Sequence, residues 1–163
     1  EVEDREIDED RFVSYEKDAE LPVSVDLMVG AVHTRQTGAS WSYDELFQNA
    51  ERKEIEGSKK SVTVRIPKKE LLMAMKLHSA RMTDARDVVA LAEDVDFDQV
   101  AEYLDRGDQD QLRESLEEVK DTITGEGFAD AFRGVFSEQK VPEEQIEQVR
   151  DFLQEQIDEL GSR

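Results

Sequence analysis

Asp26 and Lys76 are charged side chains in segments where hydrophobic residues dominate, so each needs a polar partner, solvent or a site. Asp26 lies within the alternating apolar segment 23–29. Its neighbours in the chain are expected to pack, so its carboxylate needs a cation, a metal ion or water on the opposite face. Lys76 lies among leucine and methionine residues in a helical pattern. Its ammonium either extends to solvent past a packed interface or reaches into a site.

A group of charges follows Lys76 along the chain. Arg81 comes five residues later, and Asp84 and Asp87 are three residues apart on one predicted helix face. An ammonium acts on phosphates and carboxylates as a point charge, whereas a guanidinium acts as a planar fork. Ordinary ion pairing at a protein surface explains one such spacing. Four such charges at the corner between two helices are a more specific pattern.

The first part of the chain is predicted to form two antiparallel hairpins. Apolar residues alternate in each strand, and turn-forming residues separate the strands. The paired segments are residues 11–15 with 23–29, and residues 52–56 with 61–66. Residues 30–40 are expected to form a loop. Ser42, followed three residues later by Glu45, predicts a capped helix that ends near residue 50.

From Pro67 onward the pattern is helical. The segment Leu71–Leu77 is apolar nearly all round, which predicts a buried central helix. Further helices are expected after Thr83, Asp96, Asp108, Glu126 and Pro142. The last carries a single apolar stripe for packing on a partner helix, either within the chain or in a homodimer or partner protein. The predicted fold is α+β, with a partial mixed or antiparallel sheet over residues 1–66 and a helical region of about six helices over residues 67–163.

Composition limits the class of protein. The formal net charge is −20 over 163 residues, arginine outnumbers lysine, and the sequence pI is about 4.4. Such acidity is similar to that of cytosolic proteins of salt-loving archaea, in which molar salt screens carboxylate repulsion. An ordinary acidic protein is the alternative. Nonspecific DNA binding is not expected from this charge.

Several further classes are excluded or disfavoured. The chain has no cysteine, so it has no disulfide framework, thiol nucleophile or zinc knuckle. Its two histidines are far apart, and neither a phosphate loop nor a nucleophile elbow is present. No apolar segment is long enough for a membrane helix, and the acidic N-terminal residues do not resemble a signal peptide. We therefore expect a cytoplasmic protein with no membrane partner.

Positive charge is concentrated in one segment. Between Arg52 and Arg86 there are ten basic and four acidic residues, a net charge of +6, so the remainder carries −26. A basic segment in so acidic a chain indicates an anionic ligand, such as the phosphates of a nucleotide or an RNA. The alternative is that these cations pair with neighbouring carboxylates.

The order of these features resembles the polymerase-beta-like nucleotidyltransferase superfamily, in particular the minimal nucleotidyltransferases and the abortive-infection toxin-type transferases of toxin-antitoxin systems. In that family a central strand bearing an Asp is followed by a hairpin and then by a helix with a Lys, an Arg and an Asp-rich turn. The residues that carry the resemblance are Val25–Met28, Trp41–Phe47, Ile66–Leu72 and Lys76–Leu91.

The resemblance implies roles for five residues. Asp26 would be a catalytic carboxylate and a Mg²⁺ ligand. Lys76 and Arg81 would bind nucleotide phosphates, while Asp84 and Asp87 would orient these cations or contact the base. The reaction implied for the intact protein is transfer of a nucleoside monophosphate from an NTP to an acceptor such as a small molecule, a protein or a tRNA end.

The sequence departs from the family at one motif. The Gly-Ser and acidic pair that open the family pattern are missing, and Asp8-Glu9-Asp10 has acidic spacing without a preceding Gly-Ser. The motif is expected either upstream of Glu1 or lost from a degenerate copy, and this chain alone is expected to be inactive. The alternative function is a noncatalytic helical module that binds a partner protein on the same scaffold.

Overall fold

The alternating segments at the start of the chain pair as antiparallel strands in the computed structural model. The structure describes residues 2–6, 12–17, 23–28, 30–136 and 141–162, and side chains from Leu27 onward. The strands are β1 (Val2–Glu6), β2 (Phe12–Lys17), β3 (Val23–Met28), β4 (Ala31–His33), β5 (Ser40–Ser42), β6 (Ala50–Glu56) and β7 (Ser61–Pro67). They form a three-stranded sheet in the order β1-β2-β3 and two separate pairs, β4-β5 and β6-β7.

Both predicted hairpins are present. In the first, β2 pairs antiparallel with β3 and places Ser14 opposite Asp26. In the second, β6 pairs with β7 and places Ile55 opposite Val62. The first sheet is extended by β1, which sequence reasoning did not assign to a strand because its residues are almost all charged.

The expected loop at residues 30–40 contains a short pair of strands instead. Val32 of β4 lies opposite Trp41 of β5, and the Trp41 side chain is completely buried. Burying so large an aromatic residue fixes the backbone on both sides of it, which orders the segment beyond what its small polar residues indicate. The predicted cap follows directly, because the Ser42 hydroxyl accepts a hydrogen bond of 3.2 Å from the Glu45 N–H.

The helical region follows the predicted order. Asp96 and Asp108 cap their helices as expected, with side-chain oxygens that accept hydrogen bonds from backbone N–H groups of the first turn. The helices are α1 (Tyr43–Gln48), α2 (Lys69–Ser79), α3 (Met82–Leu91), α4 (Phe97–Leu104), α5 (Gln109–Thr124), α6 (Phe128–Phe136) and α7 (Glu143–Gly161).

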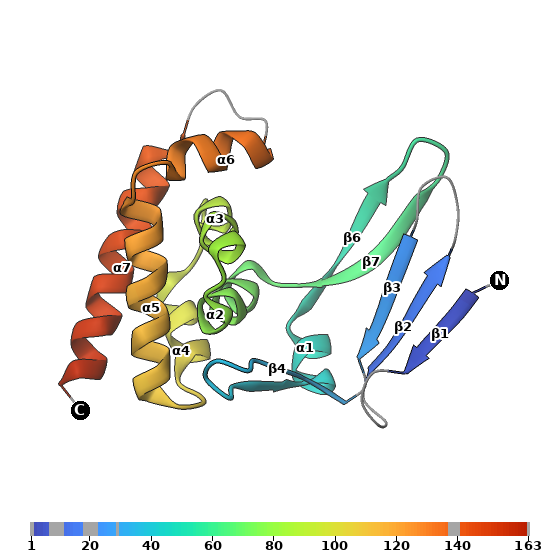
Figure 1. Ribbon diagram of the computed structural model, residues 1–163, viewed down its shortest axis with the longest axis horizontal. Coiled ribbons are helices and arrows are strands. Elements are labelled where there is room, and N and C mark those ends of the chain that lie inside the picture. The colour runs from blue at the N-terminus through green and yellow to red at the C-terminus, as the bar shows by residue number, and fades with distance from the viewer. Residues whose placement is uncertain (1, 7–11, 18–22, 29, 137–140, 163) are drawn as a thin grey trace.

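The main core lies between these helices. Figure 1 shows α5 and α7 side by side, with α2 and α3 against the inner side of α5, and α4 packs on α2. Val149, Leu153 and Ile157 of the predicted α7 stripe are buried in this core, so the stripe packs within the chain. Each such side chain contributes roughly 1.5–3 kcal/mol by leaving water, which makes α5 and α7 the stable base on which α2 and α3 are positioned.

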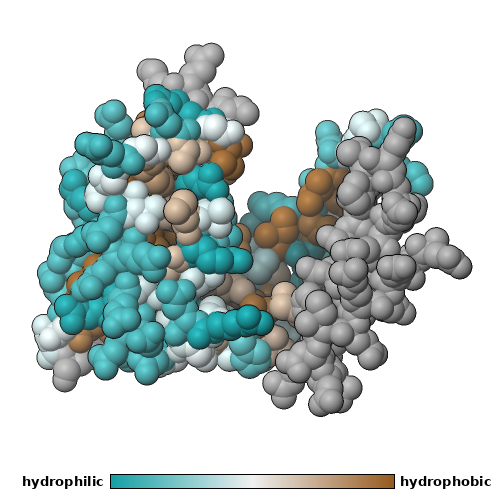
Figure 2. All heavy atoms as spheres, in the orientation of Figure 1, coloured by the Kyte–Doolittle hydropathy of each residue, from teal (hydrophilic) through white to brown (hydrophobic). Residues whose placement is uncertain are grey.

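The surface differs between the two halves. Hydrophilic side chains cover most of the visible helical half, whereas hydrophobic ones gather along the part of the β6-β7 hairpin nearest the helices (Figure 2). Ile55 and Val62 of this hairpin are both more than half exposed, at 52% and 58%. Within the described parts of the chain, no helix combines the length and the hydrophobicity needed to cross a bilayer.

Candidate phosphate-binding site

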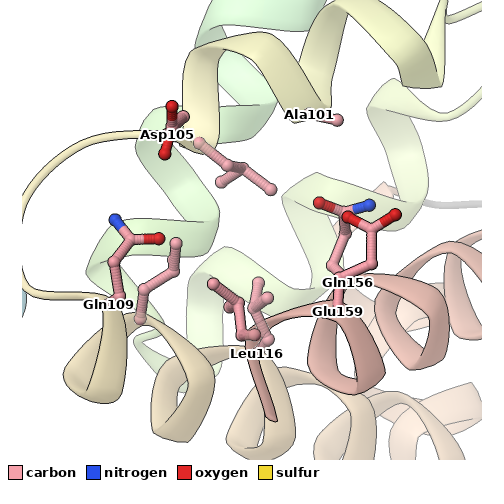
Figure 3. A pocket seen from close by; sticks show the side chains of 9 residues that line it. Ala101, Asp105, Gln109, Leu116, Gln156 and Glu159 are labelled. Atoms are coloured by element: carbon pink, nitrogen blue, oxygen red, sulfur yellow. The ribbon is translucent and has the colours of Figure 1, made fainter. Parts of the chain in front are cut away.

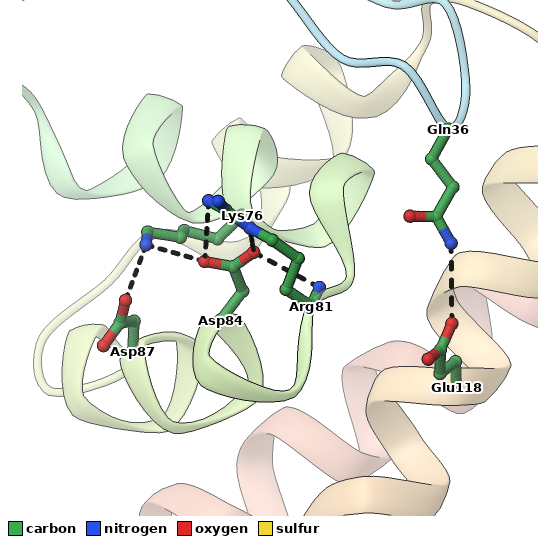
Figure 4. A network of polar contacts seen from close by, with 6 residues as sticks. All are labelled: Gln36, Lys76, Arg81, Asp84, Asp87 and Glu118. Atoms are coloured by element: carbon green, nitrogen blue, oxygen red, sulfur yellow. Dashed lines mark hydrogen bonds and ion pairs between the residues drawn. The ribbon is translucent and has the colours of Figure 1, made fainter. Parts of the chain in front are cut away.

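Lys76, Arg81, Asp84 and Asp87 meet at the corner between α2 and α3 (Figure 4). The Lys76 ammonium donates hydrogen bonds of 2.7 Å to Asp84 and 2.6 Å to Asp87. Arg81 donates to the same Asp84 carboxylate through Nε, at 2.8 Å. The structure therefore brings together four of the five residues that the sequence singled out.

The fold of the corner explains this arrangement. The apolar residues of α2 face the core, so Lys76 is left on a partly covered side with 24% of its side chain exposed. The helix ends at Ala80 in the left-handed conformation, with φ of 46°, and the chain turns back immediately into α3. Arg81 and Asp84 are thereby returned to the end of α2.

The start of α3 differs from the sequence prediction. Thr83 was expected to cap this helix, but the helix begins at Met82 and Arg81 occupies the cap position. The Asp84 carboxylate accepts a hydrogen bond of 3.2 Å from the Arg81 backbone N–H. Because this carboxylate satisfies a free N–H group of the first turn, a threonine cap is not needed.

Electrostatics hold the corner in its charged form. Burial favours a neutral Asp84 carboxyl, but hydrogen bonds from Arg81 and Lys76 outweigh it and keep the pKa below its ordinary value. Partial burial likewise opposes the charge on Lys76, yet hydrogen bonds to Asp84 and Asp87 raise its pKa above the ordinary value. At neutral pH this is a network of two cations and two carboxylates, with Asp84 completely buried at its centre.

A groove of about 590 Å³ opens beside this network. Two parts of the chain contribute to its lining: Lys76 and Arg81 come from the wall formed by α2 and the turn into α3, and His33 and Arg35 come from the wall formed by β4 and the following loop. Its apolar lining consists of Met28, Val32, Leu72 and Met75. The groove thus combines cationic side chains with hydrophobic surface, the combination that a nucleotide requires for its phosphates and its base.

Asp26 is only partly placed. Its backbone lies in β3, but its side chain lies outside the described residues, so its role as a catalytic carboxylate and Mg²⁺ ligand stays a prediction. Met28, two residues further along the same strand, lines the groove. The motif Asp8-Glu9-Asp10 also lies outside the described residues.

The described residues near the groove do not form a Mg²⁺ site. Asp84 and Asp87 already accept hydrogen bonds from cationic side chains, which compete with a metal ion for the same oxygens. Among the described side chains, no group of three His, Asp or Glu residues is arranged to hold a metal. Asp26 stays the predicted ligand.

The loop that carries Arg35 is held in place from several sides. Thr37 is 2% exposed, and its hydroxyl shares a hydrogen bond of 2.8 Å with Nδ1 of the buried His78. The Thr37 carbonyl accepts a hydrogen bond of 2.8 Å from the Asp108 N–H. At Gly107 a Cβ would lie 2.6 Å from the same carbonyl oxygen, and φ is +69°, so only glycine fits this approach.

Arg35 and His33 were missed as groove residues. The local signal was a basic side chain beside a histidine in a segment of small residues, which by itself also fits an exposed loop. What brings them to the groove is the contact between Thr37 and His78, which are 41 residues apart in the chain. No local pattern contains this information.

Two other hollows are less suited to a nucleotide. The hollow between α4, α5 and α7 (Figure 3) holds about 30 Å³, room for little more than a water molecule. A groove of about 560 Å³ between the end of α3 and α7 has the acidic residues Asp94, Asp151 and Glu155 in its lining. Its negative charge repels phosphates, so the groove beside Lys76 is the better candidate.

Comparisons with protein-family models, with curated proteins and with solved structures found no match to the chain.

Proposed function

We propose that the groove beside Lys76 binds the phosphates of a nucleotide, in a nucleotidyltransferase-like protein that in its intact form transfers a nucleoside monophosphate from an NTP to an acceptor. The observation that carries this proposal is the convergence of Lys76, on α2, and Arg81, the cap residue of α3, at one open groove. Cations that converge beside a cavity are a common basis of phosphate recognition.

Lys76 and Arg81 would contact the phosphates through different N–H groups. An ammonium has three N–H groups, and Asp84 and Asp87 accept from Lys76, which leaves one N–H for a ligand oxygen. Arg81 has 70% of its side chain exposed and bonds Asp84 chiefly through Nε. Its outer N–H groups are therefore accessible to phosphate oxygens. Asp84 is a positioning residue, because it fixes both cations without facing solvent itself.

Asp26 and Mg²⁺ would act in the proposed transfer reaction, whereas the proposed binding of phosphates depends on the groove beside Lys76. A carboxylate-bound divalent ion would supply charge neutralisation for phosphoryl transfer. The acceptor, whether a small molecule, a protein or a tRNA end, would have to reach the same groove.

One observation favours the alternative, a noncatalytic module that binds a partner protein. The corner contains two cations and two carboxylates, so it can exist as a structural ion network without any ligand. Exposed hydrophobic residues on the β6-β7 hairpin would then offer a surface to the partner.

Equilibrium binding of ATP separates the two functions. Lys76→Gln removes a groove cation, whereas Lys120→Gln makes the same change on α5, where the Lys120 ammonium bonds only Gln154 at 2.8 Å among the described residues. The proposal predicts ATP binding by the parent chain, a loss of about tenfold for Lys76→Gln and little change for Lys120→Gln. Equal affinities of all three proteins, or no binding by the parent chain, would contradict it.

A further inference from the structure

We propose that Arg35 supplies the second cationic wall of the groove and makes it a site for a polyphosphate chain rather than for a single phosphate. This inference rests on the proposed function, because it concerns the ligand of the same groove. The observation behind it is that one exposed arginine, carried by a loop fixed to α2, lines the same groove as two cations that already have carboxylate partners.

The charges at the corner of α2 and α3 largely cancel. Lys76 and Arg81 carry two positive charges, and Asp84 and Asp87 carry two negative ones within hydrogen-bond distance. Such a network positions N–H donors but contributes little net attraction for an anion. A further cation without a carboxylate partner would add the net attraction that this network lacks.

Arg35 fits that requirement. It lines the groove, it is exposed, and among the side chains that the structure describes it makes no ion pair or hydrogen bond. No described carboxylate therefore competes with a ligand for its guanidinium, which carries five N–H donors. A guanidinium in this state attracts a phosphate more strongly than one that is already bonded to a carboxylate.

The position of Arg35 is set by the loop around it. The Thr34 N–H donates to the Ala39 carbonyl at 2.9 Å, and the Gly38 N–H donates to the Thr34 carbonyl at 3.1 Å. Next to Arg35, the Gln36 amide reaches Glu118 of α5 at 3.5 Å (Figure 4). Because these hydrogen bonds already order the loop, the loop loses less conformational entropy when Arg35 binds a ligand.

The hydrogen bond between Thr37 and His78 fixes this loop relative to Lys76. His78 lies two residues after Lys76 in α2, and Thr37 lies two residues after Arg35 in the loop. The 2.8 Å bond between them is buried, so the two cationic walls are joined within a few residues of each cation. Cations on two walls fit an anion with charge at several positions, because separate phosphates of one chain can contact both walls.

Isothermal titration with inorganic phosphate, pyrophosphate and tripolyphosphate tests this inference. We compare the parent chain with Arg35→Gln and with Arg113→Gln, a control at an exposed arginine that pairs with Glu117 on α5. The titrations use the lowest KCl concentration at which circular dichroism shows all three proteins folded, because salt weakens exposed electrostatic contacts.

The expected result is an affinity of the parent chain that rises with the number of phosphates. Arg35→Gln should lose about tenfold in affinity for tripolyphosphate and less than about threefold for inorganic phosphate. Arg113→Gln should behave as the parent chain does. Equal losses of Arg35→Gln for both ligands, or no loss, overturn the role of Arg35 while leaving the groove as a phosphate site. No binding by the parent chain overturns the proposed function itself.

A second pair of variants tests the fixed loop without removing a charge. Thr37→Val abolishes the hydrogen bond to His78, whereas Thr37→Ser retains a hydroxyl. If the loop positions Arg35, Thr37→Val should lower tripolyphosphate affinity and Thr37→Ser should restore it, with inorganic phosphate binding unchanged in both. Full tripolyphosphate affinity in a folded Thr37→Val protein would contradict the positioning role.

Discussion

Thr37, in the loop after β4, and His78, near the end of α2, share a buried hydrogen bond that joins the strand half of the molecule to the helical half. Trp41 packs against the same imidazole, with ring centroids 5.3 Å apart. The contact thus ties the loop that carries Arg35 to the helix that carries Lys76. Because His78 is titratable, this contact makes the stability of the protein depend on pH.

His78 should make the protein lose stability in mild acid. Burial lowers its pKa to about 4 from an ordinary value of 6.5, the Arg106 charge acts in the same direction, and a backbone contact with Leu104 opposes them. The unfolded chain therefore binds a proton at His78 before the folded chain does. The stabilisation is complete above pH 6.5 and is lost as the pH falls towards 4, by about 3 kcal/mol.

Denaturant unfolding between pH 4 and 7 gives the free energy of unfolding of the parent chain and of His78→Gln. The difference between the two proteins isolates the effect of His78, because many carboxylates also titrate in this range. In His78→Gln, this part of the pH dependence of the unfolding free energy should be absent. His33→Gln is the control, since it leaves His78 in place. Identical pH profiles for His78→Gln and the parent chain would show that His78 does not control this stability.

Asp84 and Asp87 should differ in their effect on stability although they bond the same ammonium. Asp84 is completely buried, so Asp84→Ala leaves Lys76 and Arg81 without their shared partner and should cost about 2–3 kcal/mol. The Asp87 side chain is 37% exposed, so Asp87→Ala should cost less than about 1 kcal/mol. Midpoints and slopes of urea unfolding curves give both free-energy costs, and equal costs would contradict the assigned arrangement.

The sequence predicted the elements around the site better than the site itself. Ser42, Asp96 and Asp108 marked helix starts correctly because a cap is a local interaction between neighbouring residues. Lys76 was expected either to extend to solvent or to reach into a site. Its hydrogen bonds to Asp84 and Asp87 are compatible with both alternatives and do not decide between them.

Other features could not be found from local patterns. The pairing of Val32 with Trp41 depends on the burial of Trp41 under α2, which is a tertiary contact. The arrival of Arg35 at the groove depends in the same way on Thr37 and His78. Sequence periodicity is a short-range signal. It shows which face of a helix or strand is buried, but not which loop will pack against a distant helix.

Asp26→Ala in the intact protein tests the catalytic part of the proposal. If Asp26 is a catalytic carboxylate, NTP-dependent labelling of the acceptor should fall by at least about a hundredfold, while ATP binding at the groove changes much less. Asp44→Ala, a carboxylate near the start of the short helix α1, is a suitable control. Undiminished labelling in Asp26→Ala would contradict a nucleotidyltransferase mechanism that uses this residue.

The fold should depend on salt. A net charge of −20 is screened within about 3 Å in 1 M salt but acts across the whole molecule in dilute buffer. Lowering KCl from molar to millimolar concentrations should therefore reduce the helical signal in far-UV circular dichroism or lower the thermal midpoint. An unchanged spectrum and midpoint over this range would contradict the similarity to proteins of salt-loving archaea.

Photolabelling with 8-azido-ATP, followed by mass spectrometric mapping of the labelled peptides, tests most directly whether the groove beside Lys76 is a nucleotide site. The account predicts that the label lies on peptides that contain the groove-lining residues of segments 32–36 or 72–81, and that excess ATP and tripolyphosphate both suppress it. Label confined to α5, α6 or α7, or label at the groove that neither competitor reduces, would contradict it.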